Sequence, residues 1–326
     1  MSTLASLPDP ITPGASKFGS TFVRTFRECP FKWWLTFWAP HPSHSDATGL
    51  VNPVLGKPLA IGQFTHIGLA EYHLDGCRIT TGAEAIFQAL RDYEGPMMED
   101  QGEVENESLF LLTQYDSFWA GDHPEIVYVD GHPVVERNLV VTMGYRDYTY
   151  TARLDALVNW RGHNCVFEHK TVDTGRFGSL VASAPIDIQI VGQKFLAHHL
   201  LPDLKVDRIL LNCLIKRRAA GKDPCAREDI YIPDPIIEKF RLDITRTLAQ
   251  IDEATVLWKE LGEAGMEPYE AGRQAFSQHG SKDCSWCQFK EICLDPTHAN
   301  RYANIFLPRA SSGGSTRTTN GGANNE

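Results

Sequence analysis

The chain has no long apolar run and no excess of positive charge, and each absence excludes a class of protein. It contains no stretch of about eighteen consecutive apolar residues, so no membrane-spanning helix is expected. Its first residues lack the charged-then-apolar pattern of a secretion signal, which favours an intracellular, cytoplasmic protein. The net charge of −10 argues against a surface coated with basic groups. A local basic groove built from Lys32, Arg153 and residues 216–218 remains open.

The two ends of the chain differ in composition from its middle. Residues 1–13 are rich in Pro and Ser, and we expect a mobile arm. Residues 309–326 are rich in Ser, Thr, Gly and Asn, a low-complexity tail that cannot bury a core. A chain of 326 residues can form one large domain or two small ones. We expect a single domain over residues 14–308.

The most informative stretch is residues 150–171, which predicts two strands joined by a polar turn that contains Gly. Asp155 lies on the first strand, and Glu168 and Lys170 lie on the second. Because side chains alternate along a strand, Glu168 and Lys170 point to one face and His169 points to the other. Two carboxylates and an amine can therefore meet at one sheet edge.

This grouping suits a metal-assisted reaction. Mg²⁺ takes oxygen ligands, commonly one or two carboxylates together with phosphate oxygens of a substrate. A lysine beside the metal can orient or deprotonate the attacking water. The hairpin alone also admits a simpler interpretation, an ion pair facing solvent. The spacing Asp-x12-Glu-x-Lys, from Asp155 to Lys170, resembles the active-site motif of the PD-(D/E)XK nuclease superfamily.

The segments around this hairpin predict a mixed sheet flanked by helices. A strand at 134–142 precedes the hairpin and makes three consecutive antiparallel strands. A helix at 186–200 leads into the apolar run 207–215, which is typical of a strand buried on both faces. Strand, helix and strand form a parallel crossover. Further helices are expected at 16–28, 62–72, 81–93, 107–120 and from 234 to at least 258, with an edge strand at 228–232.

The aromatic run at 31–38 and His66 can each be interpreted in two ways. The aromatic run at 31–38 is most simply a core segment, and base stacking is the sharper interpretation. His66, on the helix expected at 62–72, is a candidate metal ligand. A lone histidine is more commonly bonded inside a core.

Eight cysteines in a chain without a secretion signal favour thiol or metal chemistry over disulfides. Cys284, Cys287 and Cys293 lie within one short segment. A zinc site or a cubane cluster takes four ligands, so one more thiolate is needed. Cys29 ends a helix just before Pro30, a good place to present a fourth thiolate. The other cysteines lie in strand-like surroundings (Cys165 and Cys213) or in polar loops (Cys77 and Cys225).

This layout resembles the RecB-like branch of the PD-(D/E)XK superfamily that carries a 4Fe-4S cluster, including CRISPR-associated and AddB-type exonucleases. In that branch a cysteine followed by proline lies in the N-terminal helix, and three cysteines lie near the C-terminus. The resemblance spans residues 16–296 and is compatible with a phage-encoded protein. It implies a restriction-endonuclease-like α/β core, whose central mixed sheet is flanked by helices and whose N- and C-terminal segments are joined by the cluster.

The resemblance also implies roles for individual residues. Asp155 and Glu168, with His66 and the backbone carbonyl of His169, would hold Mg²⁺ or Mn²⁺. Lys170 would position or activate the attacking water. Gln189 falls where the family has a glutamine near the active site, although the family often has tyrosine where this chain has Gln193. The cluster ligands would be Cys29, Cys284, Cys287 and Cys293, with Zn²⁺ as the alternative metal.

The implied function is metal-dependent hydrolysis of DNA, as a single-stranded DNA exonuclease in recombination, repair or phage replication. DNA is then the principal partner, and a helicase or recombination protein is a further candidate. Two alternatives belong to other classes. One is a non-catalytic DNA-binding or assembly module of the same fold, and the other is a zinc-stapled hydrolase of another phosphodiester.

Overall fold

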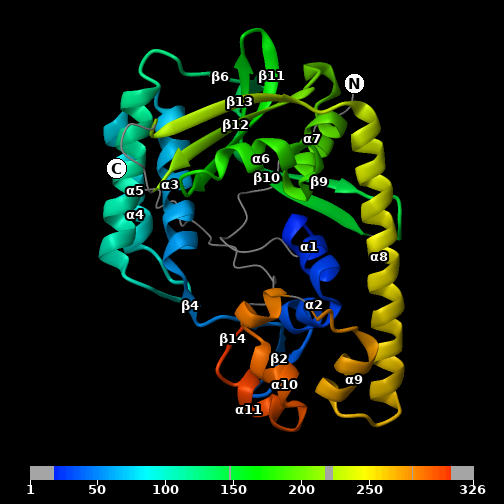
Figure 1. Ribbon diagram of the computed structural model, residues 1–326. Helices are drawn as coiled ribbons and strands as arrows, with labels where there is room; N and C mark the ends of the chain where they lie inside the picture. The colour runs from blue at the N-terminus through cyan, green and yellow to red at the C-terminus, as the bar shows by residue number, and fades with distance from the viewer. Residues whose placement is uncertain (1–17, 147, 217–222, 281, 310–326) are drawn as a thin grey trace, which may run out of the picture.

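The computed structural model of the protein describes residues 18–146, 148–216, 223–280 and 282–309. It has an α/β architecture with a mixed sheet (Figure 1). The arm expected at 1–13, most of the basic run 216–218 and all but residue 309 of the tail expected at 309–326 lie outside these residues. Within the described residues, no helix is long and apolar enough to cross a membrane.

The central sheet has six strands in the order β13-β12-β11-β10-β6, and β9 also pairs with β10. The pairs β9·β10 and β10·β11 are antiparallel, and β11·β12 is parallel across helix α7. The predicted antiparallel strands and the parallel crossover are therefore confirmed. The strands are β6 (Glu125–Ile126), β9 (Val135–Thr142), β10 (Thr149–Trp160), β11 (His163–Val172), β12 (Arg208–Ile215) and β13 (Cys225–Tyr231).

The hairpin at the centre of the sheet closes through a tight turn. Arg161 and Gly162 form this turn with φ of 52° and 84°, and Trp160 pairs with His163. Two residues with positive φ match the twist of the flanking strands. The register that pairs Ala156 with Phe167 brings Asp155 and Glu168 to the next position along the two strands.

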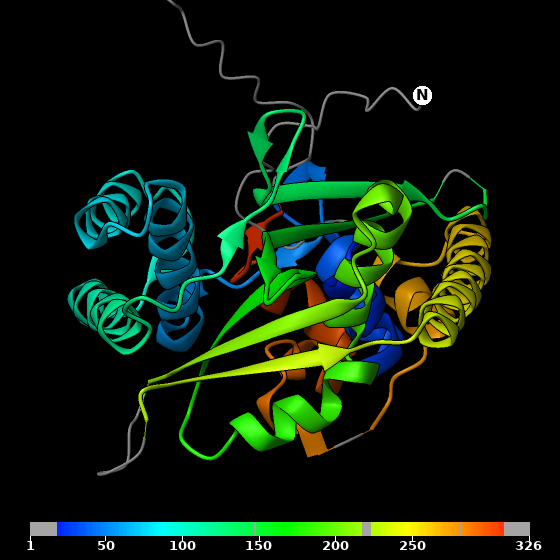
Figure 2. The same cartoon turned by 90° about the horizontal axis from the view of Figure 1, so that it is seen from above.

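Helices cover the sheet from two sides. Helix α3 contacts β9, β10 and β11 and packs with α4 and α5, whereas α7 contacts the sheet together with α8. Seen from above, the α3–α5 group and α8 lie on opposite sides of the sheet (Figure 2). These helices are α3 (Lys57–Leu74), α4 (Ile79–Arg91), α5 (Gln101–Phe118), α6 (Phe177–Ser183), α7 (Ile188–Leu200) and α8 (Asp234–Glu263).

Both ends of the described chain meet below the sheet (Figure 1). The backbone N–H of Phe31 donates to the carbonyl of Ser277 at 3.2 Å, and β3 pairs with β14. The helices here are α1 (Ser20–Glu28), α2 (Pro30–Phe37), α9 (Pro268–Ala275), α10 (Lys290–Leu294) and α11 (Ala299–Ala303). Short strands complete the fold: β1 (Pro40–His41), β2 (His44–Thr48), β3 (Leu50–Val51), β4 (Val54–Leu55), β5 (Met97–Met98), β7 (Tyr128–Val129), β8 (His132–Pro133) and β14 (Leu307–Pro308).

The aromatic run at 31–38 forms helix α2 and its C-terminal cap, an element that the sequence analysis did not predict. Trp33 and Trp34 are fully buried, so the core interpretation holds and base stacking by these two rings is excluded. Phe22 of α1 meets Trp33 with ring centroids 5.0 Å apart. Pro30 explains the break between α1 and α2, because it ends one helix and occupies the first turn of the next.

Some sequence expectations need correction. Cys225 does not lie in a polar loop, because it begins β13 and is buried. The helix expected at 16–28 begins at Ser20 with Gly19 as its cap residue, and residues 16 and 17 lie outside the described residues. Two members of the proposed basic groove are paired with acids, Lys32 with Glu28 and Arg153 with Glu136.

Candidate metal centre

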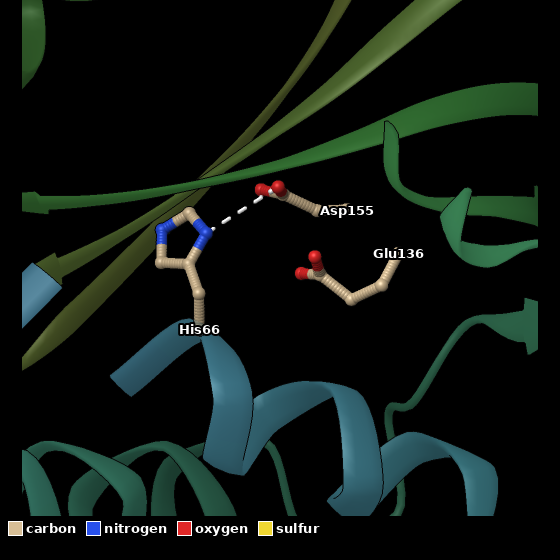
Figure 3. A group of neighbouring side chains, drawn as sticks. All are labelled: His66, Glu136 and Asp155. Carbon is tan, nitrogen blue, oxygen red and sulfur yellow. Dashed lines mark ion pairs between the residues drawn. The ribbon is translucent and has the colours of Figure 1, made fainter. Parts of the chain in front are cut away.

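Three side chains from three elements converge on one face of the sheet. His66 comes from α3, Glu136 from β9 and Asp155 from β10, and one ligand atom from each lies within 4.8 Å of the others. Figure 3 shows the imidazole and both carboxylates turned toward a common point, with His66 Nδ1 3.3 Å from Asp155 Oδ1. We call His66, Glu136 and Asp155 the candidate metal centre.

Local structure explains why these three side chains meet. Asp155 is held by the backbone N–H of His169, which donates to its Oδ2 at 2.8 Å. Leu154 pairs with Arg137, so Glu136 is the next residue along β9 toward Asp155. Glu136 has a φ of 48°, a left-handed conformation that a non-glycine residue rarely adopts. Such strain in a strand commonly marks a functional site.

The charges of the candidate metal centre act strongly on one another. Burial alone would raise the pKa of Asp155, but the neighbouring imidazole of His66 and the His169 N–H hold it well below its usual range. Burial opposes protonation of His66, yet the Asp155 carboxylate raises the His66 pKa overall. Burial and the charge of Asp155 raise the pKa of Glu136 to about 7, against the effect of Arg153. Asp155 and Glu136 thus repel each other, and His66 and Arg153 offset part of that repulsion.

Glu168 and Lys170 form a second group next to the first. The Lys170 ammonium pairs with Glu168 Oε1 and donates to Gln189 Oε1 at 3.0 Å. Gln189 Nε2 donates to Glu168 Oε1 at 2.8 Å, and Gln193 Nε2 donates to Glu168 Oε2 at 2.6 Å. We call Glu168, Lys170, Gln189 and Gln193 the carboxylate network. It fixes both the carboxylate and the amine from helix α7.

The carboxylate network and the candidate metal centre are electrostatically joined. Burial raises the pKa of Glu168, and the charge of Asp155 raises it further, while Lys170 opposes both effects. Burial would lower the pKa of Lys170, but Glu168 raises it overall, so the amine is held as an ammonium. Glu168 is fully buried and lies outside the group of three ligand atoms. The two groups form one acidic site with a single lysine in it.

The backbone and the side chain of His169 make different contacts. Its N–H supports Asp155, while its buried ring bonds to Asn212 with 3.0 Å between the two nitrogens and stacks on His73 at 5.8 Å. Burial lowers the pKa of His169 well below its usual value, so the ring is neutral. The ring lies on the opposite side of β11 from Glu168, as strand alternation predicts. A role for its backbone carbonyl stays a prediction.

The four cysteines from the two chain ends lie close to one another. Burial, together with the nearby Cys287, Cys29 and Cys284, raises the pKa of the Cys293 thiol to about 12. Cys29 is the cap residue of α2, where its sulfur accepts the Lys32 N–H at 3.4 Å. We call Cys29, Cys284, Cys287 and Cys293 the cysteine group. Of the remaining cysteines, Cys165, Cys213 and Cys225 are buried and Cys77 is partly buried.

The donor sets of the two sites differ in chemistry. Two carboxylates and an imidazole offer oxygen and nitrogen donors to a divalent cation, whereas thiolates offer softer sulfur donors. Glu136 is not among the ligands expected from the sequence, and the contact between Gln193 and Glu168 was not expected either. Spacing offers no signal for Glu136, because it lies on an earlier strand. A glutamine one helical turn after Gln189 is a usable signal for Gln193.

Comparisons with known proteins give little further information. No family model and no curated protein matches the chain. Among solved structures, the chain is similar to the crystal structure of SSO0001, with 13% sequence identity and a TM-score of 0.30. The match covers 74% of this chain and 86% of that one.

Proposed function

We propose that the protein is a metal-dependent nuclease that hydrolyses phosphodiester bonds of DNA, with single strands as its substrate. The observation that carries the proposal is the junction of the candidate metal centre with the carboxylate network. It unites a set of possible cation ligands with the half-buried Lys170 ammonium, which Gln189 and Glu168 hold in place. The proposed fold is a restriction-endonuclease-like core.

Each side chain has a definite task in this proposal. His66, Glu136 and Asp155 would hold Mg²⁺ or Mn²⁺, and Glu168 would complete the site. Such a cation, when bound, would supply Lewis-acid polarisation of the phosphate and a water of lowered pKa. Lys170 orients the attacking water and stabilises charge on the phosphate oxygens, while Gln189 fixes the Lys170 ammonium. The bond from the water oxygen to phosphorus forms as the ester bond breaks, and the proton that the water loses is matched by the proton that the leaving oxygen takes up.

The cysteine group is proposed to bind a 4Fe-4S cluster with a structural role. The support is that four thiols from the two chain ends lie near one another, which is the number of thiolates that a cubane cluster takes. We further propose action as an exonuclease in recombination, repair or phage replication, with a helicase or recombination protein as a candidate partner.

The test is an anaerobic purification followed by two measurements on one sample. The first is the absorption spectrum near about 400 nm, where a cluster with thiolate ligands absorbs. The second is digestion of end-labelled single-stranded DNA in Mn²⁺ or in EDTA. We expect a brown protein that degrades DNA only with the free cation. DNA binding without turnover would favour a non-catalytic module, and a zinc protein that cleaves only another phosphodiester would favour the hydrolase alternative.

A further inference from the structure

A cavity of about 310 Å³ lies at the start of helix α7, which carries two residues of the carboxylate network. It lies between helix α1 and the segment that leads into α7, and its lining residues are Arg24, Arg27, Ser183, Ile186, Asp187 and Ile188. We call this cavity the arginine pocket. Asp187 and Ile188 directly precede Gln189, which holds Lys170 at 3.0 Å. Residues that line the pocket are therefore adjacent in sequence to a residue of the proposed active site.

Arg27 brings a positive charge to this pocket without a matching ion pair. Its Nε donates to Thr247 Oγ1 at 2.9 Å and one Nη donates to the Asp243 carbonyl at 2.8 Å, and both acceptors are uncharged. In the part of the chain that the structure describes, no carboxylate oxygen forms an ion pair with it. Loss of solvent around the guanidinium lowers the pKa of Arg27 despite the nearby charge of Asp243, although the residue as a whole is exposed. An accessible guanidinium without a carboxylate partner can bind an anionic ligand.

The other charges around the pocket leave it positive. Arg24 is one helical turn before Arg27 and makes only a long contact with Glu28, 3.9 Å from Nε to Oε1. Asp187 caps α7, and its Oδ1 accepts the N–H groups of Gln189 and Ile190 at 2.9 and 3.0 Å. Its carboxylate is thus engaged by the start of the helix. Two guanidinium groups face one carboxylate that is already bonded.

The rim of the pocket is apolar. Ile186 is 79% exposed, an unusual position for a large aliphatic side chain next to two arginines. Phosphodiester strands combine anionic phosphates with flat bases, and proteins bind them with basic groups beside apolar or aromatic contacts. The pocket offers both kinds of contact.

We propose that the arginine pocket binds the backbone phosphate next to the one being cleaved, in a single-stranded nucleic acid. Arg24 and Arg27 contact its oxygens, and Ile186 packs against the adjoining sugar or base. This inference rests on the proposed nuclease function. It adds that the substrate strand runs across α1. It also explains how a chain with a net charge of −10 holds an anionic strand.

The test measures binding of a fluorescent oligothymidine to the whole protein in Ca²⁺ over a range of salt concentrations, and separately the cleavage kinetics in Mn²⁺. The variants are Arg24→Gln and Arg27→Gln, and the control is Arg91→Gln on the distant helix α4, where the exposed side chain contacts only Gln88. We expect each pocket variant to weaken binding about two- to tenfold and to lower the salt slope by about 0.7. KM should rise while kcat stays close to that of the wild type, and the control should change neither.

The outcomes separate this inference from the proposed function. Unchanged binding, salt slope and KM in Arg24→Gln would overturn the pocket assignment, even with an active wild type. A wild type that never cleaves, yet loses oligothymidine affinity in Arg24→Gln, would keep the pocket and overturn the nuclease. Arg24→Gln keeps the test decisive if the loss of the Arg27 contacts to α8 destabilises the protein.

Discussion

The candidate metal centre and the cysteine group are built from different parts of the chain. The first draws its side chains from strands and helices in the middle of the sequence, and Asp155 and Glu168 are 8% and 0% exposed. The second joins the start of α2 to a segment of short helical turns, where Cys284 is exposed and Trp286 is 90% exposed. The sheet positions one site, while the other lies at the surface where the two chain ends meet.

This contrast indicates what each site requires. Hydrogen bonds from His169, Gln189 and Gln193 fix the two central carboxylates before any cation binds. The four residues of the cysteine group come from two segments that lie far apart in sequence. A bound group that ties such segments together contributes its binding energy to folding. We therefore expect changes at the first site to affect activity and changes at the second to affect stability.

The largest expected effect comes from Lys170→Ala. Without the ammonium, nothing at that place orients the water or neutralises charge on the phosphate, so cleavage should fall about 10²- to 10⁴-fold. The fold should persist, because the sheet and α7 do not depend on this side chain. Single-turnover cleavage and far-UV circular dichroism measure the two effects. The control is Lys259→Ala on the exposed part of α8, and retained turnover in Lys170→Ala would refute the assignment.

Cys287→Ala tests the other side of the comparison. We expect loss of the brown colour and of most of the soluble protein, with a fall in melting temperature of more than about 10 °C in what remains. Absorption and thermal unfolding provide the measurement. Cys77→Ala is the matched control, since Cys77 lies beside His73 and far from the cysteine group in the sequence. A colourless, stable and active Cys287→Ala protein would contradict a structural cluster.

Glu136→Gln tests whether Glu136 belongs to the candidate metal centre. Removing one anionic ligand while keeping its shape should weaken Mn²⁺ binding about 10- to 100-fold, without a change in thermal stability of comparable size. Calorimetric titration with Mn²⁺ gives the affinity. The control is Glu125→Gln on the nearby strand β6, where the side chain is exposed. Equal affinities for wild type and Glu136→Gln would remove Glu136 from the site.

The smallest effect concerns acid stability at His73, a buried histidine of α3. Burial, with lesser contributions from His123 and Arg227, lowers the pKa of His73 to about 3. A depressed histidine pKa means that the neutral ring stabilises the fold above the unfolded value of 6.5 and that this stability is lost as the pH falls toward 3. The slope is at most about 1.4 kcal/mol per pH unit. Urea unfolding of wild type and His73→Gln between these pH values should show a shallower dependence in the variant, and identical slopes would refute the assignment.

Strand alternation made much of the fold and part of the site predictable. It placed Glu168 and Lys170 on one face and the ring of His169 on the other, and the apolar run at 207–215 gave the buried parallel strand β12. These are local patterns, with a period set by the backbone. The end of the first helix at Cys29-Pro30 was also predictable from neighbouring residues, although the same proline also marks the start of α2.

The missed residues depend on contacts that local patterns do not encode. Glu136 reaches Asp155 because its backbone adopts a left-handed conformation, and nothing in the neighbouring sequence requires that. Gln193 looked like a departure from the family pattern, yet its amide takes a place beside Glu168. The arginine pocket joins residues 24–27 to residues 183–188, a contact set by how α1 packs against α7.

The most direct test of the central claim is an anomalous-scattering map from a crystal soaked in Mn²⁺. The account predicts a peak bounded by His66 Nδ1 and the carboxylates of Glu136 and Asp155, next to Glu168 and Lys170. A saturating soak that leaves this position empty, or that places Mn²⁺ at a different set of side chains, would contradict it.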